Sequence, residues 1–76
     1  MNKLFKEDNT EMYMEKIEII LDRAKNESTA KSNVVDFYLT LIEDEEVELD
    51  TEQIIDMADS YGYDFSNFEE LIENSK

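Results

Sequence analysis

The chain has 76 residues, enough for one small domain, and its net charge of −14 argues against direct binding to nucleic acid phosphates, which requires Lys and Arg. It contains no histidine and no cysteine, which excludes disulfides, thiolate nucleophiles and the commonest general base and metal ligands. Proline is absent and glycine occurs once, whereas β-rich proteins need both residues in their turns. We therefore expect an all-α fold.

Residues 1–9 are predicted to be a flexible lead-in, and residues 10–76 a single acidic helical domain. No apolar segment is long enough for a signal peptide or a membrane span, which predicts a cytoplasmic protein without membrane contact. The first helix is expected over residues 10–26, with Thr10 as its N-cap. Its apolar residues recur at helical spacing and predict one buried face, formed by Tyr13, Ile17, Ile20, Leu21 and Ala24. An acidic row on another face has i, i+4, i+7, i+11 spacing: Glu11, Glu15, Glu18 and Asp22.

The next segment, residues 26–33, is predicted to be a polar connection. Ser28, Thr29 and Ser32 compete there as caps of the second helix, which is expected over residues 32–45. The apolar residues of this helix cover a broad surface, so we expect a central helix that contacts several neighbours.

The third helix, expected over residues 51–61, has clear signals at both ends. Asp50 is a suitable N-cap, and Gln53 lies at the position that returns the bond in a capping box. Gly62 follows the last apolar residue, where a left-handed helix stop favours a residue without Cβ. Tyr63 is then placed to close a Schellman motif.

A fourth short helix is expected over residues 67–74. Ser66 is its predicted cap and Glu69 lies at the capping-box position. Together these segments predict a small bundle of three to four short helices, in which the last two form a C-terminal helical hairpin.

The charges are distributed unevenly along the chain. Residues 1–31 contain six basic and seven acidic residues, whereas residues 32–75 contain fourteen acidic residues and no basic one. Six of the acids occur in the eight residues 43–50, EDEEVELD. Because no histidine, cysteine or intact EF-hand loop is present, we expect no enzymatic activity, no cofactor and only weak binding of calcium or zinc.

Residues 37–71 resemble the nitrogen-fixation-type leader-peptide family, which precedes the core of ribosomally made natural products. The shared features are an aromatic-apolar helix followed by acids, an apolar helix with the stop Ala58 to Gly62, and a tail that begins YDFS. The chain departs from the family at residues 74–76, which contain neither a double-glycine-like cleavage site nor a modifiable core. The resemblance implies a recognition module that binds a modifying enzyme.

The charge pattern favours another function, in which the chain occupies the basic, nucleic-acid-binding surface of a partner protein. Small anti-restriction and anti-CRISPR inhibitors have this size and charge, and their acidic surfaces act as DNA mimics. Tyr61 and Tyr63 are candidates for apolar anchors, or they only close the helix stop. The residues predicted to contact the partner are Glu43, Asp44, Glu45, Glu46, Glu48, Asp56, Asp59, Tyr61 and Tyr63.

Overall fold

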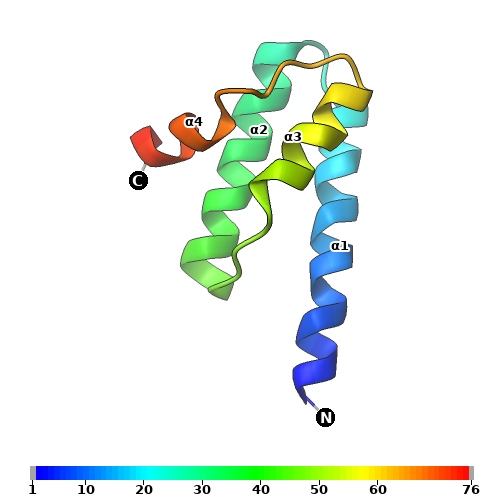
Figure 1. Cartoon of the computed structure of the whole chain (residues 1–76), viewed down its shortest axis with the longest axis vertical. Coiled ribbons are helices and arrows are strands. Elements are labelled where there is room, and N and C mark those ends of the chain that lie inside the picture. The colour runs from blue at the N-terminus through cyan, green and yellow to red at the C-terminus, as the bar shows by residue number, and fades with distance from the viewer. Residues whose placement is uncertain (1, 76) are drawn as a thin grey trace.

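A computed structural model describes the backbone of residues 2–75 and the side chains of residues 10–75, and this part of the chain contains helices and no strand. The elements, in order, are α1 (Asn2–Arg23), α2 (Glu27–Thr40), the π-helical turn η1 (Leu41–Glu45), α3 (Thr51–Ser60) and α4 (Phe68–Ser75). Helices α1 and α2 form an antiparallel pair, α3 packs on α1, and α4 packs on α2 (Figure 1). Helices α3 and α4 also contact each other, so the predicted all-α bundle with a C-terminal hairpin is confirmed.

The core lies where the four helices meet. Phe65 and Phe68 stack with their ring centroids 5.7 Å apart, and Tyr38 of α2 meets Phe68 edge-on at 5.6 Å. These aromatic contacts join the C-terminal hairpin to α2, which contacts both α1 and α4 as expected of a central helix. The buried hydrophobic residues are Ile17, Leu21, Ala30, Val34, Tyr38, Leu41, Leu49, Ile54, Ala58, Phe65, Phe68 and Ile72.

The first two helices begin earlier than predicted. Helix α1 starts at Asn2, so Thr10 lies inside it and the predicted cap there is wrong. Residues 2–9 contain no proline or glycine, so nothing in the sequence interrupts helix propagation. Helix α2 starts at Glu27, and its cap is Asn26, whose side-chain oxygen accepts a 2.8 Å hydrogen bond from the Thr29 amide. The predicted polar connection therefore contributes most of its residues to α2.

Both ends of α3 agree with the sequence. Asp50 caps the helix by accepting a 3.0 Å bond from the Glu52 amide. At the other end, Gly62 has a φ of 82° and its amide donates to the Asp59 carbonyl at 2.9 Å. The Tyr63 amide donates to the Ala58 carbonyl at 3.0 Å, which completes the predicted Schellman motif.

The start of α4 uses different partners from those predicted. The Glu69 carboxylate accepts a 2.5 Å bond from the Thr51 hydroxyl, so the predicted box residue of α4 bonds to the start of α3 instead. The Ser66 amide donates to the Asp64 carboxylate at 3.0 Å, forming an Asx turn before the helix. The Thr51–Glu69 bond therefore joins the two helices of the hairpin, and the Asx turn lies in the loop between them.

Candidate functional site

The acidic segment 43–48 lies at the far end of α2, where the chain reverses. Glu46 has the left-handed values φ 56° and ψ 38°, and the amides of Glu46 and Val47 both donate to the Leu41 carbonyl. The wide π-helical turn thus ends in a left-handed stop that the sequence did not predict. The five predicted contact residues of this segment are all exposed: Glu43, Asp44, Glu45, Glu46 and Glu48.

This segment is attached to the core at the end that leads into α3. The Tyr38 side chain is buried, and its hydroxyl donates a 2.9 Å hydrogen bond to the Leu49 carbonyl. Burial, followed by the negative charges of Glu48, Glu69 and Asp50, raises the pKa of the Tyr38 phenol above its ordinary value. The buried phenol therefore fixes the position where the acidic segment enters α3.

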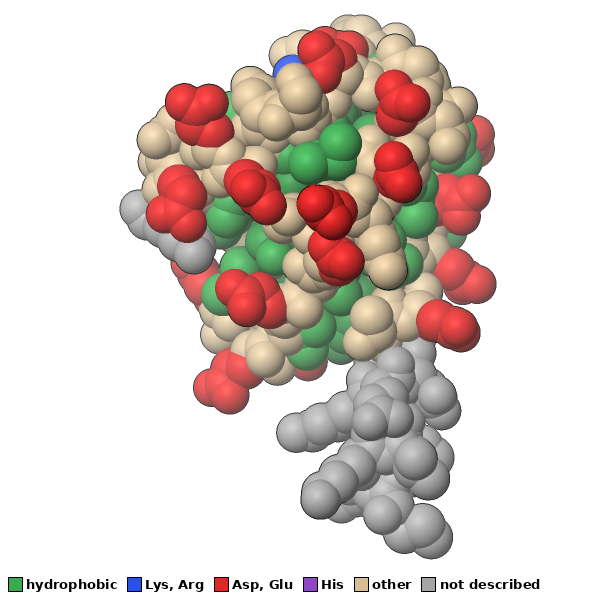
Figure 2. Space-filling view, in the orientation of Figure 1, with side chains coloured by type: hydrophobic (Ala, Val, Ile, Leu, Met, Phe, Trp, Pro, Cys, Tyr) green, Lys and Arg blue, Asp and Glu red, His purple; other side chains and the backbone are tan. Residues whose placement is uncertain are grey.

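The other predicted acids, Asp56 and Asp59, lie exposed on the outer face of α3. Glu52 extends this row, because residues 52, 56 and 59 share one helical face opposite the buried Ile54 and Ala58. Figure 2 shows carboxylates spread over the face that α3 and its neighbours form, with very little Lys or Arg in view. The sequence identified this group only in part, since Glu52 was not among the predicted contacts.

Tyr61 and Tyr63 both use their hydroxyls within the chain. Tyr61 donates to the Glu18 carboxylate of α1 at 3.2 Å, and Tyr63 donates to the Ala24 carbonyl at 3.5 Å. Desolvation and the adjacent carboxylate of Glu18 raise the pKa of the Tyr61 phenol. Each tyrosine therefore connects the end of α3 to α1, and both remain partly exposed beside the acidic residues.

The packing of α3 on α1 brings a second acidic row into the same surface. The row consists of exposed residues, Glu11, Glu15, Glu18 and Asp22. Two grooves of about 450 and 530 Å³ lie along the junction of α1 and α3, and both contain carboxylates of this row. Spacing in the sequence predicts the row, but its position beside α3 depends on a tertiary contact that no local pattern specifies.

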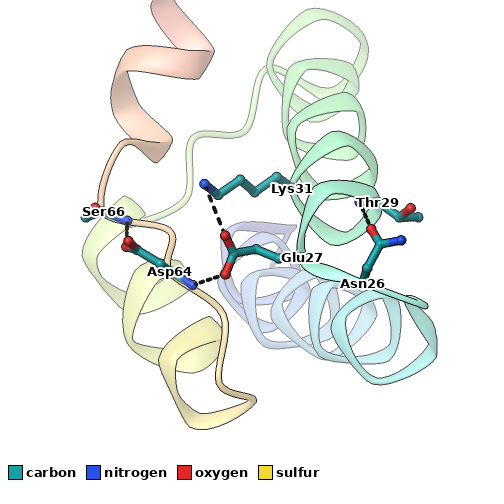
Figure 3. A network of polar contacts seen from close by, with 6 residues as sticks. All are labelled: Asn26, Glu27, Thr29, Lys31, Asp64 and Ser66. Atoms are coloured by element: carbon teal, nitrogen blue, oxygen red, sulfur yellow. Dashed lines mark hydrogen bonds and ion pairs between the residues drawn. The ribbon is translucent and has the colours of Figure 1, made fainter.

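The loop between α3 and α4 is held on the start of α2 by a small polar network (Figure 3). The Glu27 carboxylate accepts a 2.9 Å bond from the Asp64 amide and pairs with Lys31 at 3.8 Å. Hydrogen bonds from Ser66 and the positive charge of Lys31 lower the pKa of the Asp64 carboxyl. Lys31 is also the last basic residue before Lys76, and it forms an ion pair within this network.

Within residues 10–75, no three acidic side chains converge closely enough to hold a metal ion. Of the helices in the described part of the chain, none combines the length and apolar character needed to cross a bilayer.

No protein-family model, curated protein or solved structure matches this chain. The resemblance of residues 37–71 to leader peptides therefore stays a prediction.

Proposed function

We propose that this chain is a non-enzymatic binding protein that occupies a basic, nucleic-acid-binding surface of a partner, as a nucleic-acid-mimic inhibitor of the anti-restriction or anti-CRISPR type. The observation that carries the proposal is that exposed carboxylates gather on α1, on α3 and on segment 43–48, which leads into α3. The partner would meet this surface through the Lys and Arg residues that otherwise contact phosphates.

The spacing of the carboxylates supports this comparison. A helix rises about 1.5 Å per residue, so the α1 row from Glu11 to Asp22 carries one carboxylate per roughly 5.5 Å. The α3 row from Glu52 to Asp59 has a spacing of roughly 5 Å on the same rise. Side by side, two such rows give about one charge per 2.7 Å, against about one per 1.7 Å along duplex DNA. Counting carboxylates alone, the two rows reach roughly 60% of the linear charge density of duplex DNA, and Lys16 and Arg23 on α1 reduce the net value.

Basic residues adjoin this surface only on the α1 side, where Lys16, Arg23 and Lys25 are exposed and Arg23 lines the groove beside Glu18 and Asp22. Residues 32–75 contain no basic residue, and Lys31 is paired with Glu27. A rigid surface of one charge sign increases the rate of encounter with a basic partner and orients it before contact. Because these acids lie on helices, of which α3 is capped by Asp50, the partner does not have to order their backbone on binding.

The leader-like alternative has less support from the packing. The apolar residues of the α3–α4 hairpin, such as Ile54 and Phe68, are buried against the rest of the chain. A modifying enzyme would have to recognise the outer face of the hairpin, where Asp56 and Asp59 lie exposed. Recognition through that face would again depend on its negative charge.

The proposal is tested by displacement of nucleic acid. A fluorescently labelled DNA duplex is bound to a basic DNA-binding protein encoded beside the gene for this chain, and the chain is titrated in. We expect stoichiometric displacement that weakens steeply as the Debye length decreases from about 30 to 10 Å with added salt. Binding of the chain to the protein while the DNA remains bound would contradict the proposal.

A further inference from the structure

A pocket of about 580 Å³ lies between the end of α2, the segment that leads into α3, and α4. Its floor is apolar and consists of Tyr38, Ile42, Leu49 and Ile72, of which Ile42 is partly exposed and the others are buried. Ile42 gives this floor an apolar surface that a ligand can contact, which favours a ligand with a hydrophobic part.

The rim of the pocket has the opposite character. Glu48 and Asp50 lie on the segment before α3, and Glu69 and Glu73 lie on α4. The Thr51 hydroxyl donates to Glu69 and the Glu52 amide donates to Asp50, so two of these carboxylates are positioned by bonds within the chain. A carboxylate has about four lone-pair sites, so both can accept further donors.

The charges of the rim act on the floor of the pocket. After burial, the negative charges of Glu48, Glu69 and Asp50 are the next largest causes of the raised pKa of the Tyr38 phenol. The electric field of these three carboxylates therefore reaches the floor of the pocket at the Tyr38 hydroxyl. A ligand that complements both features has an aliphatic stem and a cationic end.

We propose that this pocket receives an arginine side chain of the basic partner, with its stem on the apolar floor and its guanidinium group between the carboxylates of the rim. The planar guanidinium has five N–H donors in a fixed fork, which suits acceptors on more than one wall of a pocket. The ammonium group of lysine is compact and more strongly hydrated, so it complements this arrangement less well. This inference rests on the proposed function, since it specifies how the basic partner is held.

The first test uses an acetylated and amidated peptide whose only charge is that of a single arginine, and two matched peptides in which lysine or citrulline replaces it. Citrulline keeps the shape of arginine and removes its charge. Binding to the full chain is followed by NMR from the amide shifts of Thr51 and Ile72. We expect the arginine peptide to bind at least about tenfold more tightly than the citrulline peptide and more tightly than the lysine peptide. Equal affinities for all three, or shifts confined to other helices, would overturn the inference.

The second test compares two variants with the same change in net charge. Glu48→Gln with Glu69→Gln removes two charges from the rim, and glutamine at position 69 still accepts the Thr51 bond. Asp56→Asn with Asp59→Asn removes two charges from the outer face of α3, away from the pocket. We expect a roughly tenfold loss of affinity for the arginine peptide in the first variant and less than about a twofold loss in the second. Equal losses would mean that the peptide responds only to the total charge, and the pocket would be rejected.

The two proposals fail in different experiments. The peptide assay contains no DNA and no partner protein, so failure of DNA displacement alongside specific arginine binding would overturn only the proposed function. Retained displacement by the chain, together with no preference for arginine, would overturn only the pocket.

Discussion

Among residues 2–75, two have left-handed backbone conformations, Gly62 with a φ of 82° and Glu46 with a φ of 56°. They lie at the C-terminal ends of α3 and η1 respectively. A residue with Cβ pays about 1 kcal/mol or more to adopt this conformation, whereas glycine adopts it freely. The same physical cause therefore predicts opposite effects of substitution at the two positions.

A Cβ atom at Gly62 would meet no other atom within 4 Å, so the cost of Gly62→Ala is conformational and not steric. We expect a loss of about 1 kcal/mol, which lowers the midpoint of thermal unfolding by about 4–8 °C in a domain of this size. At position 46 the comparison is between Glu46→Gly and Glu46→Ala, because both remove the carboxylate and only the backbone preference differs. The glycine variant should be the more stable by about 1 kcal/mol.

The assay is urea unfolding followed by circular dichroism, with thermal unfolding as a second measurement. Glu46→Ala serves as the control for the removed charge, and Gly62→Asn as a control that tolerates a left-handed backbone better than alanine does. An unchanged stability of Gly62→Ala, or a glycine variant at position 46 no more stable than the alanine variant, would refute the reasoning about these helix ends.

Three further predictions concern the stability of the fold. Tyr38→Phe leaves the Leu49 carbonyl without its side-chain donor and should cost about 1–2 kcal/mol in urea unfolding; no loss would show that this hydrogen bond does not hold the acidic segment. Because the folded state raises the pKa of Tyr38 and Tyr61, their contribution to stability is complete below about pH 10 and is lost as pH rises through the folded pKa values. Unfolding measured from neutral to alkaline pH should show this decline, and a stability that rises above pH 10 would contradict it. Since the net charge of −14 repels itself, added sodium chloride should raise the free energy of unfolding between low and moderate salt, and a fall would contradict the account.

Local sequence signals were sufficient for the C-terminal hairpin. Asp50 and Gly62 act within one or two turns of their own helix, so their roles follow from residue type and spacing alone. The apolar positions of α3 and α4 are similarly local, since helical period determines which residues share a face. The helices of the hairpin were therefore predictable from local signals, whereas the core was predicted only in part, since Ala30 of the predicted polar connection is buried and Tyr13, Ile20 and Ala24 are only partly buried.

The remaining features depend on tertiary packing or on competition between neighbouring residues for the same role. Asn26 was overlooked as the cap of α2 because several nearby residues have similar cap preferences. Glu46 has no sequence signal for a left-handed conformation, which glutamate seldom adopts. Glu69 bonds to Thr51 across the hairpin, and a capping pattern contains no information about such a partner. The candidate surface was found only in part for the same reason, since its α1 row joins it through the packing of α1 on α3.

The central claim, that negative charge imitating phosphates carries the interaction, is tested most directly by a variant in the DNA-displacement assay. Replacing Glu43, Glu45, Glu46 and Glu48 by glutamine removes four charges and nearly preserves shape. Its control is Asp36→Asn with Glu70→Gln, because both residues are exposed and belong to α2 and α4, outside the two acidic rows and segment 43–48. With both variants shown to be folded by circular dichroism, we expect the glutamine variant to need at least about tenfold more protein for displacement and to lose salt dependence. For each charge removed, the control variant should lose much less of its ability to displace DNA. Displacement by the glutamine variant as efficient as that by the original chain would contradict the account, and recognition through the hairpin would take its place.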